Sequence, residues 1–315
     1  MTKNKIVYVT GSSGFIASHV VDAFIKEDYI VIGIDHAKNF HNIIDRNYLF
    51  FQKDLGDVAS LKKLFQKYPP SHIVHQASSL VDVEKSIQQP WKSQEDIINT
   101  TKLVETALPF GLQHIVFSSS ANIYGTHPKT PTKETDILQP ASPYGLTKLA
   151  IEEYLKYFSK RNNITCTIFR YFNIFGERQS PYSSACIPTF INNLLKDEPI
   201  TLRGGDQTRD FIYVKDVANA NVLACKKNAS LICNIGMGKG QEISTILMLI
   251  AQLMKVKPKI LQKEKDPADC IASLANIKEA EKYLQWSPKT SFNEGIINTI
   301  GYYEKLYRTK MLSQV

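Results

Sequence analysis

The stretch V-T-G-S-S-G-F-I-A-S-H, from Val9 to His19, decides how this sequence folds. Gly11, Gly14 and Ala17 have the spacing G-x-x-G-x-x-A, directly after an apolar, β-branched run and at the start of a segment with helical periodicity. Glycine at the turn lets the backbone come close to a pyrophosphate, and the helix N-terminus offers free N–H donors and a positive dipole. The stretch therefore predicts a strand, a phosphate-binding turn and a helix.

Asp35 ends the next strand-like segment, Ile30–Asp35. A carboxylate at that point can accept hydrogen bonds from both ribose hydroxyls of NAD and repels the 2′-phosphate of NADP. We therefore expect NAD as the cofactor. His36 follows directly and Lys38 is close behind, so the sequence alone leaves NADP open.

Strand-like and helix-like segments alternate through the first half of the chain. Continuous apolar strands separated by helices indicate a parallel sheet that is covered on both faces. The expected fold class is therefore α/β, with a Rossmann-type doubly wound parallel sheet. The expected strands are 6–10, 30–35, 49–55, 72–77, 115–119 and 165–172, and the expected helices are 14–26, 58–67, 95–108 and 143–161.

After about residue 173 the pattern is looser, and we expect a smaller, mixed α/β substrate lobe. Residues 187–196 look helical, residues 199–209 are rich in turns, and two or three helical segments lie between 240 and 308. Phe211–Ala224 has the pattern of a strand and helix that return to the first lobe. The expected domains are an NAD-binding Rossmann domain of residues 1–172 plus about 211–236, and a substrate-binding lobe of residues 173–210 and 237–315.

The composition is that of an ordinary globular protein, with 315 residues, 43% of them hydrophobic and 22% charged. No apolar run is long enough to span a bilayer and the N-terminus lacks signal-peptide order, so we expect a cytoplasmic protein without a membrane partner. The net charge of +8 is spread along the chain without a basic block, which argues against nucleic acid as a partner. The five cysteines and seven histidines show no metal-ligand spacing, so we expect reduced thiols and no metal.

Ser120, Tyr144 and Lys148 make up the candidate catalytic group. Ser120 ends a strand-like run, at the edge where open α/β sheets bind their ligands, and Tyr144 and Lys148 lie one turn apart on the expected helix. A phenol has a pKa near about 10, so it needs cationic neighbours before it can act as a base near neutral pH. Lys148 would supply such a charge beside the nicotinamide ribose. Tyr144 would then take a proton from a sugar hydroxyl while Ser120 holds the oxygen.

With these motifs in order, the chain resembles the extended short-chain dehydrogenase/reductase family and, within it, the nucleotide-sugar epimerases. The resemblance covers nearly the full length and includes H-Q-A-S-S at 75–79 and R-Y-F-N at 170–173. It implies that NAD is lined by Gly11, Ser13, Gly14, Phe15, Ile16, Asp35, Asp54, Leu55, Gln76, Ala77, Ser78, Asn99, Ser118, Tyr144, Lys148 and Phe172.

The resemblance also implies a site for the nucleotide sugar. Arg209, in the segment Gly204–Val217, matches an arginine that grips the diphosphate, and R-Q-S-P-Y at 178–182 is similar to a loop of UDP-glucose and UDP-N-acetylglucosamine 4-epimerases. Asp266 departs from the family, which often has a diphosphate-binding arginine there; Lys263 or Lys265 could substitute. A small Ser273 would leave room for an N-acetyl group. The implied substrate contacts are Ser120, Asn173, Arg178, Arg209 and Ser273.

Two enzyme functions are compatible with the catalytic group. The first is an NAD-dependent 4-epimerase of UDP-glucose or its N-acetylated counterpart, which works by transient hydride transfer through a 4-keto sugar. The second is a 4-ketoreductase that consumes NAD(P)H. Both need the serine, tyrosine and lysine, and the nearly continuous epimerase-like motifs favour the first. A binding protein on a dehydrogenase scaffold is a third reading, which the intact catalytic group disfavours.

Two related activities are disfavoured by the residues that follow Ser120, which are Ala121 and Asn122. Sugar 4,6-dehydratases of the family carry an Asp-Glu pair at these positions, and UDP-glucuronate decarboxylases carry a Glu at the second of them. Without an acid, an elimination has no proton donor. We therefore expect neither activity.

A homodimer is expected by the same resemblance. Leu103, Val104, Ala107 and Leu108 have helical spacing and could line a two-helix dimer face together with Pro143–Arg161. Burial within the subunit would give the same spacing.

Overall fold

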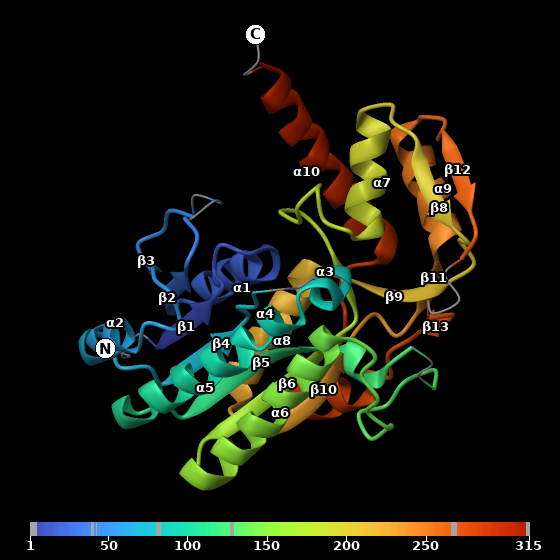
Figure 1. Cartoon of the computed structure of the whole chain (residues 1–315). Coiled ribbons are helices and arrows are strands. Elements are labelled where there is room, and N and C mark those ends of the chain that lie inside the picture. Colours follow the sequence, from blue (N-terminus) through green and yellow to red (C-terminus); the bar gives the residue numbers. More distant parts are fainter. Residues whose placement is uncertain are drawn as a thin grey trace.

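The computed structural model describes residues 5–38, 41, 43–79, 83–126, 129–265 and 270–312 (Figure 1). Its largest element is a seven-stranded sheet with the order β10-β6-β5-β4-β1-β2-β3, in which every neighbouring pair is parallel. This confirms the expected doubly wound α/β fold. The strands are β1 (Ile6–Thr10), β2 (Ile30–Asp35), β3 (Tyr48–Gln52), β4 (His72–His75), β5 (His114–Ser120), β6 (Thr165–Tyr171) and β10 (Leu231–Ile235).

Helices cover both faces of this sheet (Figure 1). Strand β1 shows why both are needed: Val7 and Val9 join a cluster with α1 and α8, whereas Tyr8 between them joins a cluster with α2, α5 and α6. Successive side chains of a strand point to opposite faces, so an entirely apolar strand must be covered twice. The helices are α1 (Phe15–Lys26), α8 (Val214–Lys227), α2 (Val58–Lys67), α5 (Glu95–Ala107) and α6 (Pro143–Asn162).

A smaller mixed sheet lies beyond the carboxyl edge of the large one. It is built on β9 (Thr208–Tyr213), which pairs antiparallel with β11 (Gly240–Glu242) and parallel with β7 (Asn173–Phe175) and β13 (Ala272–Ser273). Strands β8 (Ile200–Arg203) and β12 (Ile260–Lys263) form a separate parallel pair. Helices α7 (Cys186–Leu195), α9 (Ile243–Met254) and α10 (Phe292–Leu312) enclose the apolar core of this part.

Short helices complete the described chain. They lie in connections between the longer elements, several of them close to the carboxyl edge of the large sheet. They are α3 (Val83–Gln88), α4 (Pro90–Ser93), the 3-10 turns η1 (Leu108–Phe110) and η2 (Ala121–Tyr124), and the π-helix η3 (Ala280–Leu284).

Two expectations for the second half are wrong. Residues 199–209 contain β8 and the start of β9 rather than turns alone. Strand β9 joins the small sheet, so only α8 of the expected strand-helix pair returns to the large sheet, where the unpredicted β10 supplies the seventh strand. The partners of these strands lie far away in sequence, and local patterning does not reveal which strands pair. The domain boundaries stated above stay a prediction.

The expected dimer face is also wrong, because the four residues predicted to line it at the end of α5 and in η1 lie against the core. Leu103, Val104 and Ala107 have no exposed surface and pack in the core between α5 and the sheet, and the partly buried Leu108 packs against the same cluster. Their spacing therefore reflects burial within the subunit.

In the described ranges, no helix has the length and apolar character needed to cross a bilayer. The same ranges contain no group of histidine, cysteine, aspartate and glutamate side chains arranged to hold a metal ion.

Three buried histidines link the stability of the fold to pH. Burial lowers the pKa of His19 and His75 to about 4 and that of His114 to about 3, because a charged imidazole would lose its hydration. The folded state keeps them neutral, whereas in the unfolded chain they bind protons below about pH 6.5. The stability linked to these groups is therefore complete above about pH 6.5 and falls as the pH drops toward 4.

Replacing His114 with glutamine should make the free energy of unfolding less sensitive to acid. Between about pH 7.5 and about pH 5, the decrease should shrink by about 2 kcal/mol, because one proton-linked group is removed. Urea unfolding at the two pH values measures this decrease, whatever the variant's stability at neutral pH. His36→Gln is the control, since the His36 side chain is 82% exposed, whereas His114 is buried. An undiminished decrease in His114→Gln would contradict the prediction.

Candidate active site

The turn after β1 is held against the segment after β4. Gly11 has a φ of +68°, and a Cβ atom at this position would lie 2.8 Å from the Cα of Ala77. Its N–H donates to the carbonyl of Ile34 at 2.8 Å, and the N–H of Gly14 donates to the carbonyl of Gly11 at 2.8 Å. Only glycine combines this backbone conformation with such a close approach.

The N-terminus of α1 is open to an anion. Gly14 caps the helix without a side-chain hydrogen bond, and the first turn contains no acidic residue. The N–H groups of the first turn, including those of Phe15 and Ile16, have no intrahelical partner and lie at the positive end of the dipole. Ser13 Oγ is buried and has no hydrogen-bond partner among the described residues. These unpaired donors at the positive end of a helix fit a diphosphate, so the turn has the chemistry of a dinucleotide site.

Asp35 lies at the carboxyl end of β2, beside this turn. Its carboxylate is buried and accepts the N–H groups of Ser13 and Ala37, both at 2.9 Å. Each carboxylate oxygen can accept more than one hydrogen bond, so capacity remains for ribose hydroxyls. Asp35 thus ties the end of β2 to the turn after β1. The neighbouring His36 Nδ1 lies 3.4 Å from Asp35 Oδ1.

A buried hydrogen-bond chain fixes the segment after β4. His75 Nδ1 lies 2.7 Å from Thr10 Oγ1 and His75 Nε2 lies 2.9 Å from Thr100 Oγ1, which itself donates to the carbonyl of Asp96. Since the Thr100 hydroxyl donates elsewhere, it accepts from His75, and the proton of the neutral ring therefore sits on Nε2. Thr10 Oγ1 also accepts the N–H of Ala77 at 3.2 Å, so this chain holds Ala77 against Gly11.

The other predicted cofactor residues lie around the same edge. Gln76 donates to Tyr171 and Asn221, and Ser78 donates to Asp96. Ser118 Oγ donates to the carbonyl of His75 at 3.1 Å. Asp54 and Asn99 both lie close to Gly56. A Cβ atom on Gly56 would be 3.1 Å from Asp54 Oδ1 and 3.2 Å from Asn99 Oδ1. The adjacent Leu55 packs against the core.

The turn that carries Ser120 touches the start of α6. Ser142 caps this helix through a hydrogen bond from the N–H of Gly145 at 3.1 Å. A Cβ atom on Gly145 would lie 2.9 Å from the carbonyl oxygen of Asn122, so glycine permits this contact. Asn122 in turn donates to Ser120 Oγ through its backbone N–H and its side-chain amide, at 3.2 and 3.1 Å. The contact sets Ser120 close to the first turn of α6, which holds Tyr144.

Lys148 is buried in this cluster. Its Nζ lies 5.6 Å from the centre of the Tyr144 ring and 5.1 Å from the centre of the Phe117 ring, within the range of a cation–π contact. After burial, the charge of Lys148 is the next largest cause of the lowered pKa of His75. The structure thus brings together the lysine, the tyrosine and the end of β5 at the carboxyl edge of the sheet.

Two predicted substrate residues meet across the small sheet. Ser273 in β13 pairs with Arg209 in β9, although 64 positions separate them in the sequence. Phe172 is buried with Ile123, Tyr124 and Ala275, which connects the catalytic turn to the residues after Ser273. The exposed Asn173 starts β7 directly after Phe172.

Arg178 is placed elsewhere. It has a φ of +65° and its Nη1 forms an ion pair of 2.8 Å with Asp22 on α1. This ion pair ties the Arg178 guanidinium to α1 rather than to β9 or β13, which hold Arg209 and Ser273. The role of the loop 178–182 stays a prediction, and the direction of the Arg178 side chain depends on the local backbone turn.

Two lysines, Lys263 and Lys265, could substitute for the missing diphosphate arginine, and the structure describes both. Asp266 lies outside the described residues. Lys265 Nζ is 3.9 Å from Asp206 Oδ1, and Lys263 in β12 pairs with Arg203 in β8.

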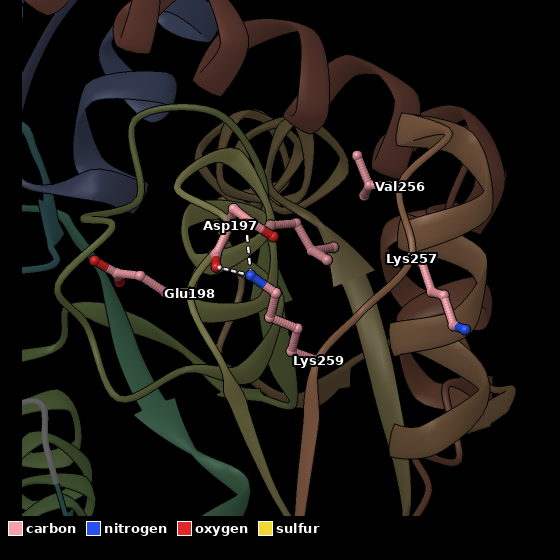
Figure 2. Close-up of a pocket in the computed structure, with 6 residues that line it drawn as sticks. Asp197, Glu198, Val256, Lys257 and Lys259 are labelled. Atoms are coloured by element: carbon pink, nitrogen blue, oxygen red, sulfur yellow. Dashed lines mark hydrogen bonds and ion pairs between the residues drawn. The ribbon is translucent and has the colours of Figure 1, made fainter.

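One surface hollow, of about 260 Å³, lies apart from this site (Figure 2). It lies where α7 and α9 end, and Lys259 Nζ forms an ion pair with Asp197 Oδ2 at 2.5 Å within it. It is lined by Leu194, Asp197, Glu198, Val256, Lys257 and Lys259, none of which is a candidate site residue.

Sequence reasoning missed two charged residues behind the site, Glu152 and Arg170, which form a buried ion pair of 2.8 Å. Arg170 belongs to the R-Y-F-N motif at 170–173, but the motif alone assigns it no role. A signal was present: Glu152 follows Lys148 by four positions, on the same face of a helix.

Comparisons with known proteins agree with this geometry. The profile of the "NAD dependent epimerase/dehydratase family" matches residues 7–236. A UDP-glucose 4-epimerase from Thermotoga maritima, solved with UDP-glucose, is 33% identical, with 96% of this chain and 99% of that chain covered and a TM-score of 0.91.

Two further similar structures were solved with other sugar nucleotides. A UDP-N-acetylglucosamine 4-epimerase from Methanobrevibacter ruminantium M1, in complex with UDP-N-acetylmuramic acid, is 32% identical over 97% of this chain and 100% of that chain, with a TM-score of 0.89. A UDP-glucuronic acid 4-epimerase from Bacillus cereus, in complex with UDP-glucuronic acid and NAD, is 28% identical over 96% and 100%, with a TM-score of 0.88.

Replacing Gly11 with alanine should weaken NAD binding at least 10-fold. The left-handed backbone costs a side chain about 1 kcal/mol or more, and the added Cβ must also push Ala77 away. NAD affinity by fluorescence titration and the melting temperature are the measurements.

The control is Gly111→Ala. Gly111 has a φ of +93° with nothing within 4 Å of an added Cβ, so this variant carries the backbone strain without the clash. It should melt earlier yet bind NAD normally. Equal NAD affinity in both variants would show that the contact with Ala77 is unimportant.

Proposed function

Because this chain belongs to the NAD dependent epimerase/dehydratase family, we propose that it inverts C4 of a UDP-hexose while NAD stays bound. It is an NAD-dependent enzyme of the nucleotide-sugar 4-epimerase type. The observation that carries the proposal is the position of the Lys148 ammonium beside the Tyr144 ring, next to the turn of Ser120.

The residues around α1 would hold the cofactor. The N–H groups after Gly11, together with Ser13 Oγ, would bind the diphosphate, and Asp35 would accept the adenosine ribose hydroxyls. NAD, when bound, supplies a reversible hydride acceptor. The remaining chemistry belongs to side chains of this chain.

Tyr144 acts as the base and then as the acid. It takes the proton of the C4 hydroxyl as the carbon becomes a carbonyl, and it returns the proton after the 4-keto sugar, which is planar at C4, has presented its opposite face. The buried Lys148 ammonium, beside the Tyr144 ring, would stabilise negative charge that develops on the reacting oxygens during this proton transfer. Ser120 donates a hydrogen bond to the same sugar oxygen and so keeps that oxygen near Tyr144.

The paired strands β9 and β13 would set the sugar nucleotide in place. Arg209 would bind the diphosphate and Ser273 would border the sugar ring, since the two residues are register partners. Asn173 would contact the sugar beside Phe172. Ser273 is small, so an N-acetyl group at C2 would fit, which makes UDP-N-acetylglucosamine a substrate alongside UDP-glucose. We place Arg178 away from the sugar ring, because its guanidinium is paired with Asp22.

We also propose that two copies associate through the outer faces of α5 and α6, which lie side by side (Figure 1). These faces expose apolar side chains that a monomer would leave in water. They are Ile98 on α5 and Leu146, Tyr154 and Tyr157 on α6, each between 46% and 56% exposed.

Purified protein incubated with UDP-glucose or UDP-N-acetylglucosamine, without added cofactor, should form the galacto-isomer with no net change in NADH. Proton NMR follows the product and absorbance follows NADH. The Ser273→Tyr variant should lose activity mainly toward the N-acetylated sugar, because the added ring would fill the space beside C2. If the protein converted none of UDP-glucose, UDP-N-acetylglucosamine and UDP-glucuronic acid, the proposal would be contradicted. Stoichiometric NAD(P)H oxidation with a 4-keto-6-deoxysugar nucleotide would favour the ketoreductase instead.

Replacing Tyr144 with phenylalanine should lower kcat by about 10²–10⁴-fold, as expected when a general base is removed. The matched control is Tyr154→Phe, which removes a hydroxyl from the exposed side of the same helix. It should leave kcat unchanged. If both variants kept full activity, Tyr144 would not be the base.

The dimer is tested by sedimentation equilibrium, which should give about twice the chain mass of 35.6 kDa. Tyr154→Lys should shift the protein toward monomers, because it places a charge in the apolar face. Tyr182→Lys alters a tyrosine that is 75% exposed on a different part of the chain and should leave the dimer intact. A monomeric wild-type protein would refute this part of the proposal.

A further inference from the structure

Glu152 extends the catalytic face of α6 into the core. Tyr144, Lys148 and Glu152 follow one another at intervals of four residues, so they lie along one side of the helix. The Glu152 side chain is completely buried, and Arg170 on β6 is nearly so. A buried carboxylate requires compensation by charge and by hydrogen bonds.

Both carboxylate oxygens of Glu152 are engaged. Arg170 Nη2 donates to Oε2 at 2.8 Å and Arg170 Nε donates to Oε1 at 3.2 Å, in a two-pronged arrangement. Ser119 Oγ also donates to Oε1. Ser119 directly precedes Ser120 on β5. Through this one carboxylate, the helix that carries Tyr144 is fastened to the strand that carries Ser120.

The same pairing leaves Lys148 available. A carboxylate one helical turn away would attract the lysine if it were unpaired. Arg170 and Ser119 occupy the carboxylate, and the Lys148 ammonium lies against the Tyr144 and Phe117 rings. Arg170 therefore supports the position of the ammonium near the phenol.

Arg170 also reaches toward the small sheet. Its Nη1 donates to Tyr124 OH at 2.9 Å and to the carbonyl of Glu134 at 2.8 Å. Tyr124 lies in the turn that follows Ser120, and its hydroxyl donates to Asn234 Oδ1 at 2.7 Å. The network thus holds both the catalytic turn and residues 132–134.

Thr132, at the start of this segment, forms a parallel bridge with Ala275, in the residues that follow Ser273. The N–H of Thr132 donates to the carbonyl of Leu274 at 2.7 Å, and the N–H of Asn276 donates to the carbonyl of Thr132 at 2.9 Å. The contacts of Arg170 therefore connect the catalytic helix to the segment proposed to border the sugar.

We propose that Glu152 and Arg170 are positioning residues, which fix Tyr144 and Lys148 relative to Ser120 and to the 273–276 segment. This inference rests on the function proposed for these three catalytic residues. Displacement of a catalytic group by about 1 Å can cost about 100-fold in rate, so a buried clamp at this point has a large effect on activity.

The alternative is a purely structural ion pair, and a charge-free replacement separates the two roles. Apolar residues of similar volume often replace a buried ion pair without loss of stability, whereas removal of one partner leaves an uncompensated charge. The test is therefore the double variant Glu152→Leu/Arg170→Met, measured by melting temperature, kcat, KM and the NAD dissociation rate. It should retain most of its melting temperature, while kcat falls 10- to 100-fold, KM for the UDP-sugar rises, and NAD dissociates about 10-fold faster.

The matched control lies one residue further on the same helix. Glu153 and Lys156 form an exposed ion pair of 2.7 Å, so Glu153→Gln/Lys156→Gln should keep every readout within two-fold of the wild type. A double Glu152/Arg170 variant with wild-type melting temperature, kcat and NAD dissociation rate would overturn the inference.

A conservative variant covers the case in which the double variant does not fold. Glu152→Gln keeps the size of the side chain and an oxygen for Ser119, but it loses the charge that pairs with Arg170. Its kcat should fall about 10-fold, and an unchanged kcat would overturn the inference. If the wild type converts no UDP-sugar, the proposed function fails. NAD dissociation from the variants then still decides the positioning role, because it needs no sugar.

Discussion

The close packing of Gly11 against the backbone of Ala77 is the constraint on which the site depends. Strands β1 and β4 are neighbours in the sheet although two other strands separate them in the chain, and here the strand order reverses. At such a point the connections leave toward opposite faces and open a crevice at the carboxyl edge. Because Gly11 has no side chain, the turn can approach the segment after β4, and the N-terminus of α1 faces that crevice.

The polar residues around this crevice form two buried networks with different tasks. The network of His75, Thr10 and Thr100 holds Ala77 in place beside Gly11, at the proposed cofactor site. The network of Glu152 and Arg170 lies behind the catalytic helix and extends to the turn after Ser120. Buried polar groups must be satisfied by specific partners, so each network admits few arrangements. Geometry at the site therefore follows from hydrogen bonding in the core.

The small sheet contains residues proposed to bind the sugar nucleotide. Its strands come from four separate stretches of the chain, and they place Arg209 beside Ser273 and bring the 132–134 segment against 274–276. The related epimerases act on UDP-glucose, UDP-N-acetylglucosamine and UDP-glucuronic acid within one fold. Loops tolerate substitution better than the elements that they connect, which suits the role proposed here for this part of the protein in recognising the sugar.

The sequence by itself determined the fold class, the strand–turn–helix at Gly11 and the chain positions of Asp35, Ser120, Tyr144 and Lys148, because these depend on local spacing and on apolar periodicity. Tertiary structure decided which short strands pair in the second half, where Arg178 points and whether Leu103 faces a partner or the core. It also decided that Glu152 meets Arg170. These outcomes depend on contacts between residues far apart in the chain, and a local pattern carries no information about which distant partner will satisfy it.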